Sequence, residues 1–168
     1  SLGRLFDAAA CLLGLCDRNR HEAEAAMALE AAAASWGEAV EPWPMPVIRR
    51  RDGLLLLPAP LVAAICEGIE AGESADRLAA QFHETIAQAL AQAALRAAET
   101  AGLSTVALSG GCFVNRILLT GVIARLEATG LRVLTNHEVP PGDGGVSLGQ
   151  AYVAIWKLAD TTSPTTGD

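Results

Sequence analysis

The segment LSGGCFVN at residues 108–115 follows the apolar run TVA and precedes an amphipathic stretch, a pattern that predicts a strand joined to a helix. Glycines at the end of a strand, here Gly110 and Gly111, permit positive φ and leave backbone N–H groups free beside the positive end of a helix dipole. Such groups bind phosphate. Asn115 can hydrogen-bond a phosphate or a base, or it can simply cap the helix. The segment matches neither a Walker loop nor GxGxxG, so a plain strand-to-helix turn stays open as an alternative.

Three carboxylates stand where they can serve a ligand. Asp143 lies in PPGDGG, a second strand-to-helix junction, and ligands of parallel sheets bind beyond the carboxyl ends of the strands. It can ligate a metal or cap the last helix. Asp7, which follows the apolar pair Leu5-Phe6, can hold ribose hydroxyls. Glu22 begins the second predicted helix, where the dipole favours an acid in any case. Both can equally be ordinary solvated carboxylates.

The histidines and cysteines form no recognisable site. His83 adjoins Phe82 on an apolar stripe and is expected to be a satisfied core histidine, while His21 and His137 are isolated. No HxxxH or CxxC pair occurs, so a metal would lack further protein ligands within this chain. The cysteines are expected to be ordinary thiols of a reducing compartment. They are Cys11, Cys16, Cys66 and Cys112.

Composition indicates a globular, closely packed protein. Of its 168 residues 51% are apolar and 18% charged, with a formal net charge of −7. This acidic balance argues against a nucleic-acid or anionic-membrane partner, although a local basic patch can still exist. No apolar run approaches the ~18 residues of a membrane span, and the start has no signal-peptide pattern. We therefore expect a cytoplasmic protein, and the missing initiator Met suggests a piece of a longer chain.

Periodicity and turn signals predict a helix-rich α/β lobe over residues 1–158 and a disordered polar tail over residues 159–168. An Asp-Gly turn predicts a β-hairpin between VIRR and LLLL. The final alternation predicts a parallel βαβα unit with a right-handed crossover. Helices are expected at about 2–15, 21–35, 61–70, 75–101, 114–129 and 144–157, with Ser1 and Ser74 as available caps for the first and the fourth.

Five motifs, taken in order, resemble one family. They are GRLFDAAACLLGL, HEAEAAMALEAAA, FH, VALSGGCFVNRILLTGVIARLEATGLRVL and VPPGDGGVSLGQA. Together they span roughly residues 1 to 157 and resemble the C-terminal part of the HypF-type hydrogenase-maturation carbamoyltransferases. More distant relatives are antibiotic O-carbamoyltransferases and tRNA threonylcarbamoyladenosine synthases.

The resemblance implies an actin-like ATPase (ASKHA) architecture, of which this chain is the second lobe. Carbamoyl phosphate and ATP then yield carbamoyl-adenylate in an upstream domain. The lobe pair transfers the carbamoyl group to the C-terminal cysteine of a HypE-type partner, on the way to the cyanide ligands of [NiFe]-hydrogenase. No catalytic nucleophile is implied in this chain, because the attacking thiolate belongs to the partner.

Carried over residue by residue, the resemblance assigns Asp7 and Glu22 to the nucleotide ribose region. Gly110, Gly111 and Asn115 would hold the adenylate phosphate and the nucleotide. The resemblance also implies a divalent metal, with Asp143 as one ligand and histidines of the missing first lobe as the others.

This sequence departs from the family at HEAE, residues 21–24, where Tyr-Glu-Gly-Gln is common. Losing the glycine puts a side chain where backbone meets the nucleotide, and Glu24 adds negative charge near a phosphate. Without the first lobe the chain is half an active site, which leaves open a non-catalytic nucleotide-binding or protein-interaction module. Transfer to tRNA is a second alternative, weakened by the charge of −7. The uncovered apolar surface of a lone lobe also predicts self-association.

Overall fold

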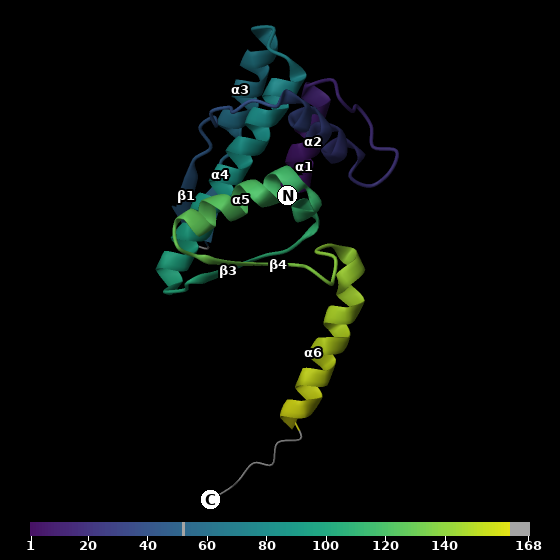
Figure 1. The fold of residues 1–168 in the computed structure, drawn as a ribbon, viewed down its shortest axis with the longest axis vertical. Coiled ribbons are helices and arrows are strands. Elements are labelled where there is room, and N and C mark those ends of the chain that lie inside the picture. Colours follow the sequence, from purple (N-terminus) through teal and green to yellow (C-terminus); the bar gives the residue numbers. More distant parts are fainter. Residues whose placement is uncertain (52, 162–168) are drawn as a thin grey trace, which may run out of the picture.

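The computed structural model describes residues 1–51 and 53–161. The tail predicted at residues 159–168 lies outside this range from residue 162 onward. Helices α1 to α5 form the body of the molecule, and α6 (Val146–Thr161) stands away from it (Figure 1). The bounds of the others are α1 Leu2–Leu12, α2 Glu24–Trp36, α3 Ala59–Glu70, α4 Ala75–Ala101 and α5 Arg116–Ala128.

Helix α4 is the longest of these elements and both of its ends are fixed by local chemistry. The hydroxyl of Ser74 accepts a hydrogen bond from the N–H of Arg77 at 3.3 Å, which makes Ser74 the N-cap. Gly102 ends the helix in the left-handed conformation at φ 67°, where a Cβ would be unfavourable. Both ends confirm the sequence-based prediction.

The apolar stripe of α4 forms the centre of the core. Leu78, Phe82 and Ile86 are completely buried, and α4 packs most extensively against α2 and α5. Burying each such side chain contributes roughly 1.5–3 kcal/mol. Small side chains let the neighbouring helices approach closely; those buried in this core include Ala32, Ala33, Ala87 and Ala91.

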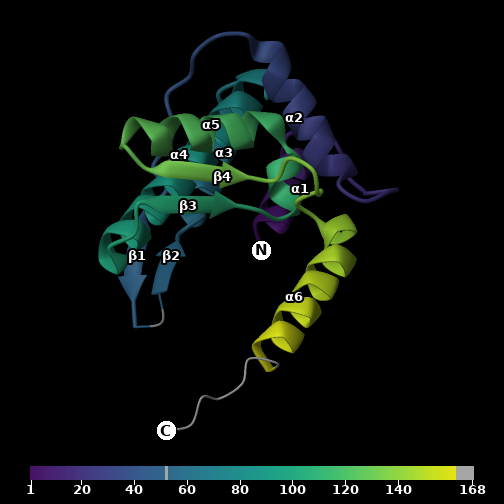
Figure 2. The ribbon, with the colours of Figure 1, turned by 60° about the horizontal axis from the view of Figure 1, so that its bottom comes forward.

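Two small sheets complete the fold. Strands β1 (Val47–Arg50) and β2 (Gly53–Leu56) pair antiparallel around the predicted turn, with Val47 opposite Leu56. Strands β3 (Thr105–Leu108) and β4 (Arg132–Thr135) pair parallel on either side of α5, with Thr105 opposite Arg132. Figure 2 shows β3 and β4 side by side next to α5. The predicted hairpin and the predicted βαβα unit are therefore confirmed.

Several helix boundaries differ from the prediction. The first helix ends at Leu12 instead of residue 15, because the chain turns through Gly14 at φ 69°. Ser1 precedes this helix but its side chain makes no capping hydrogen bond. The second helix begins at Glu24 instead of residue 21, so the residues from 16 to 23 form a loop.

The two strand-to-helix junctions begin with short 3-10 helices that periodicity does not predict. The first, η1, covers Gly111–Val114, and Asn115 separates it from α5. The second, η2, covers Asp143–Gly145 and leads directly into α6. The predicted helices at 114–129 and 144–157 each start a little later as regular α-helices. Helix α6 also runs further than predicted, to Thr161.

Helix α6 leaves the body of the molecule in both views (Figures 1 and 2). Large apolar side chains are exposed along it, among them Leu148, Tyr152 and Ile155, of which Tyr152 is 73% exposed. The spacing of i, i+4 and i+7 places these three on one face. None of the described helices is long and apolar enough to cross a membrane.

The loop before α2 contains a strained residue. Ala23 has φ 60° and ψ 14°, and it is the non-glycine residue with positive φ in the described part of the chain. It stands at the position where the resembled family commonly has glycine. A Cβ in this left-handed region costs about 1–2 kcal/mol.

We expect Ala23→Gly to raise the free energy of unfolding by up to about 1 kcal/mol, because glycine adopts this conformation without strain. The matched control is Ala31→Gly, an exposed position inside α2, where the same change should lower stability by up to about 1 kcal/mol. Urea unfolding followed by circular dichroism measures both. A loss of stability in both variants would contradict the assignment of strain to Ala23.

Candidate functional site

A cavity of about 780 Å³ lies between α1, the α1–α2 loop, α2 and η1. Four of the six residues predicted from sequence line it, although they come from distant parts of the chain: Asp7, Glu22, Gly111 and Asn115. Gly110 adjoins this lining but is not part of it. Asp143 lies elsewhere, at the start of η2.

Asp7 is held in place at the cavity by two neighbours. One carboxylate oxygen accepts a hydrogen bond from Asn19 Nδ2 at 3.2 Å, and the other pairs with Arg4 at 3.4 Å. Its side chain remains 30% exposed. The Asn19 side chain also accepts a hydrogen bond from the N–H of Ala25 at 2.8 Å and so caps α2. A carboxylate fixed in this way can accept hydrogen bonds from sugar hydroxyls.

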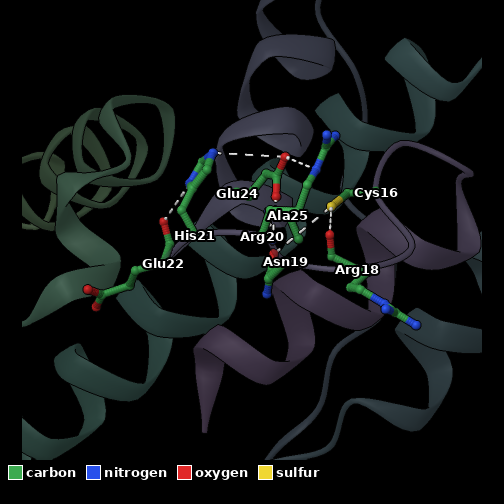
Figure 3. A network of polar contacts seen from close by, with 8 residues as sticks. All are labelled: Cys16, Arg18, Asn19, Arg20, His21, Glu22, Glu24 and Ala25. Atoms are coloured by element: carbon green, nitrogen blue, oxygen red, sulfur yellow. Dashed lines mark hydrogen bonds and ion pairs between the residues drawn. The ribbon is translucent and has the colours of Figure 1, made fainter.

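Figure 3 shows the polar network of the α1–α2 loop. Glu24 accepts the Arg20 N–H at 2.6 Å and pairs with the Arg20 guanidinium at 3.4 Å. The hydrogen bond from this N–H, against the opposing effect of burial, lowers the pKa of Glu24. Glu24 does not line the cavity, although its partner Arg20 does, so the expected extra charge near a phosphate stays a prediction. The Glu22 carboxylate points away from this pair and is exposed.

Fewer backbone N–H groups of the glycine turn are free than the sequence predicts. Gly110 has φ 109°, a value that favours glycine, but its N–H donates to the carbonyl of Pro141 at 2.8 Å. The expectation of a free N–H at Gly110 is therefore wrong, because the second junction folds back against the first. Gly111 and Cys112 begin η1, and their N–H groups make no hydrogen bond among the described residues. A Cβ on Gly111 would meet nothing within 4 Å.

Asn115 is a structural cap in this fold. Its Oδ1 accepts the N–H of Leu118 at 2.8 Å, and its Nδ2 lies 2.9 Å from Nε2 of His83. His83 is buried and its Nδ1 lies 2.8 Å from the carbonyl of Ala79, so Nδ1 must carry the proton and Nε2 accepts from Asn115. His83 is the satisfied core histidine that the sequence suggests, and it orients Asn115.

Sequence reasoning missed two residues of the site, Glu30 and Asn19. Glu30 of α2 lines the cavity, and its Oε1 accepts the N–H groups of Arg116 at 2.7 Å and Ile117 at 3.4 Å. These donors belong to the first turn of α5, 86 and 87 positions further along the chain. No local pattern marks such a pair. Asn19 was missed as well, because it lies before the N-cap position of α2, which is Ala23, and not at that position.

Asp143 shows no metal site around it. It is exposed and is the first residue of η2, which precedes α6, so it does not stand at the N-cap position directly before α6. Within residues 1–51 and 53–161 no group of three or more His, Cys, Asp and Glu side chains is placed to hold a metal ion. One carboxylate does not satisfy a divalent cation. The described residues alone therefore do not fit a metal centre.

Cys112 sits at the turn but is not an activated thiol. Burial raises its pKa, and a hydrogen bond from the Gly3 backbone offsets this only in part. The thiol is therefore protonated at neutral pH, and a thiolate is the nucleophilic form of cysteine.

The fold places this chain in a structural class. It superposes on the crystal structure of full-length HypF in the phosphate- and nucleotide-bound form with a TM-score of 0.87 at 33% identity, covering 100% of this chain and 21% of that one. For T. kodakarensis HypF the TM-score is 0.82 at 36% identity, over 95% of this chain. The chain has the architecture of an ASKHA-type, actin-like lobe.

Sequence comparison identifies the family. A family model described as carbamoyltransferase, Kae1-like domain, second subdomain, matches residues 1–150. The carbamoyltransferase HypF2 of Cupriavidus necator is 39% identical over 92% of this chain, and a carbamoyltransferase HypF homolog of that organism is 45% identical over 99%. The chain belongs to the HypF carbamoyltransferase family and corresponds to the second subdomain of its Kae1-like domain. It spans 22% and 43% of the length of these two relatives.

The His83–Asn115 pair predicts how stability depends on pH. Burial lowers the pKa of His83 below 6.5, against smaller opposing effects of the Ala79 carbonyl and Glu30. The unfolded chain therefore takes up the proton first as pH falls. We expect the free energy of unfolding to be highest above about pH 6.5 and to decrease below it.

Urea unfolding between about pH 5 and 8 measures this dependence. His83→Gln should remove most of the loss on acidification, because no titrating group is left at the site. His137→Gln, at an exposed position, should keep it. An unchanged pH dependence in His83→Gln would show that another group is responsible.

Proposed function

We propose that this chain forms the nucleotide-binding lobe of a carbamoyltransferase whose ligand is carbamoyl-adenylate, made from carbamoyl phosphate and ATP. The observation that carries the proposal is the cavity that gathers Asp7, Glu22, Gly111 and Asn115. Support also comes from relatives named carbamoyltransferases and from a HypF structure described as phosphate- and nucleotide-bound.

In this proposal Asp7 accepts hydrogen bonds from the ribose hydroxyls, and Glu22 lies beside it. The N–H groups of Gly111 and Cys112 donate to the adenylate phosphate, where preorganised donors stabilise developing charge. Gly110 shapes the turn, and Asn115 holds the start of α5 rigid under the ligand. These roles retain the predicted residues but make Gly110 and Asn115 supports for the site.

The reaction proposed for the whole enzyme is acyl transfer to sulfur. A thiolate at the C-terminal cysteine of a HypE-type partner attacks the carbamoyl carbon and forms a C–S bond. The bond from that carbon to the phosphate oxygen breaks, and AMP leaves with the electron pair. The product would serve the cyanide ligands of [NiFe]-hydrogenase. This lobe binds and orients the adenylate, and it is inactive without groups from a first lobe.

A divalent metal stays an expectation that rests on the family resemblance. Asp143 offers one exposed carboxylate, and histidines from outside the described residues would have to complete the set. No step of the proposed transfer is derived through this metal.

A non-catalytic nucleotide-binding module is the second candidate, favoured by the Ala23 methyl group that lines the cavity at the usual glycine position. Both candidates require nucleotide binding. Carbamoyl transfer by the product of the complete reading frame separates them, because a non-catalytic module would bind but not transfer.

Calorimetric titration with AMP and ATP tests the shared step. The product of the complete reading frame should bind, and Gly111→Val should weaken binding at least tenfold, because the new side chain enters open space in the cavity. The matched control is Gly149→Val on α6, also in open space. Equal affinity in wild type and Gly111→Val would remove this turn from the site.

The exposed face of α6 supports a packing role. Leu148, Tyr152 and Ile155 lie on one face of a helix that leaves the body of the lobe. The family model describes a second subdomain, and we propose that a first subdomain covers this face. In its absence a second copy of the chain takes its place, since exposed apolar patches of this kind associate.

The 168-residue chain by itself should therefore self-associate with increasing concentration in sedimentation velocity. Ile155→Glu should shift it towards monomer, because burying an unpaired charge in an apolar contact is unfavourable. Gln150→Glu adds the same charge at an exposed position facing away from Ile155 and should have little effect. A chain that stays monomeric at all concentrations would contradict the proposed face.

A further inference from the structure

The N-terminal end of α5 has no vacant donor. The first N–H groups of a helix ordinarily lack partners within the helix and are the groups that attract anions. Here the N–H groups of Arg116 and Ile117 donate to Glu30 Oε1 at 2.7 and 3.4 Å. The N–H of Leu118 donates to Asn115 Oδ1 at 2.8 Å. A carboxylate of this chain already occupies the position that a phosphate would take.

The Glu30 charge is not neutralised by a basic side chain. Two arginines line the same cavity, but Arg4 pairs with Asp7 and Arg20 pairs with Glu24. Among the described residues Glu30 itself forms no ion pair, and its Oε2 makes no hydrogen bond. The Glu30 carboxylate therefore stands without a basic partner at the wall of a cavity that Gly111 also lines.

The ligands of the proposed reaction carry different negative charges, so the Glu30 carboxylate repels them to different degrees. An acyl-adenylate has a diester-like phosphate with one negative charge. AMP is a phosphate monoester with a charge near −2 at neutral pH, since its second pKa is about 6, and ATP has still more. Repulsion from a fixed carboxylate rises with each of these charges.

We propose that Glu30 is a specificity-determining residue that favours the singly charged adenylate over ATP and over the product AMP. By closing α5 it confines the ligand phosphate to the N–H groups of Gly111 and Cys112. By its charge it disfavours ligands with additional anionic groups, and it assists release of AMP once transfer has added a charge. This inference rests on the nucleotide-binding function proposed above.

Glu30→Gln tests the inference, because a glutamine amide oxygen can accept the same N–H groups while the charge is lost. The probes are adenosine, the methyl ester of AMP with one charge, AMP and ATP, titrated without Mg²⁺ into the product of the complete reading frame. In wild type the methyl ester should bind more tightly than AMP or ATP. In Glu30→Gln the affinity for AMP should rise about threefold more than that for the methyl ester, with adenosine unchanged.

The matched control is Glu38→Gln, which removes the same charge from an exposed position that does not line this cavity. It should leave the ratio of the AMP and methyl ester affinities at the wild-type value. A second measurement needs no variant: added salt screens the repulsion, so the wild-type preference for the methyl ester should shrink as salt rises.

The outcomes separate the inference from the function on which it rests. If adenosine and the methyl ester bind but their ratio to AMP is the same in wild type and Glu30→Gln, Glu30 is a helix cap and nothing more. A wild-type preference that grows with salt would also overturn the charge effect. If none of the probes binds to wild type, the proposed nucleotide-binding function is overturned and this inference with it.

Discussion

The N–H groups at the start of α5 range from an exposed one at Arg116 to a buried one at Leu118, and the side chains that accept them also line the candidate site. An unsatisfied buried donor such as the Leu118 N–H costs about 1–3 kcal/mol. Glu30 satisfies two of the donors from α2, and Asn115 satisfies a third. Asn115 is in turn oriented by His83 from α4. Two helices, α2 and α4, thus meet the start of α5 at the cavity wall.

At the start of α2, too, a side chain that lines the cavity accepts a helix N–H group. Asn19 accepts the N–H of Ala25 to cap α2 and donates to Asp7 on α1. The capping residue therefore also fixes the carboxylate that faces the cavity. Polar groups that the two caps do not use, among them the N–H groups of Gly111 and Cys112, are left for a ligand. Fold stability and ligand geometry depend on the same hydrogen bonds.

Helix ends, which depend on neighbouring residues, could be predicted from the sequence. Hydrogen bonds between residues far apart in the chain could not. Ser74 caps α4 and the helix ends at Ala101 as predicted, because the signals that end a helix are local. The clustering of Asp7, Glu22 and Gly111 followed from family resemblance rather than from spacing. The role of Glu30 depends on donors 86 positions away, and the N–H of Gly110 is taken by a carbonyl of the second junction. Neither contact can be recognised from the local pattern of apolar and polar residues.

The departure from the family pattern at residues 21–24 affects two side chains differently. Glu24 does not line the cavity, but it pairs with Arg20, which does. Ala23 keeps the left-handed conformation suited to glycine because the Asn19 cap and the Arg20–Glu24 contacts hold the loop on both sides of it. Ala23 itself lines the cavity. The charge that distinguishes ligands comes instead from Glu30, whose carboxylate the capping of α5 keeps in place.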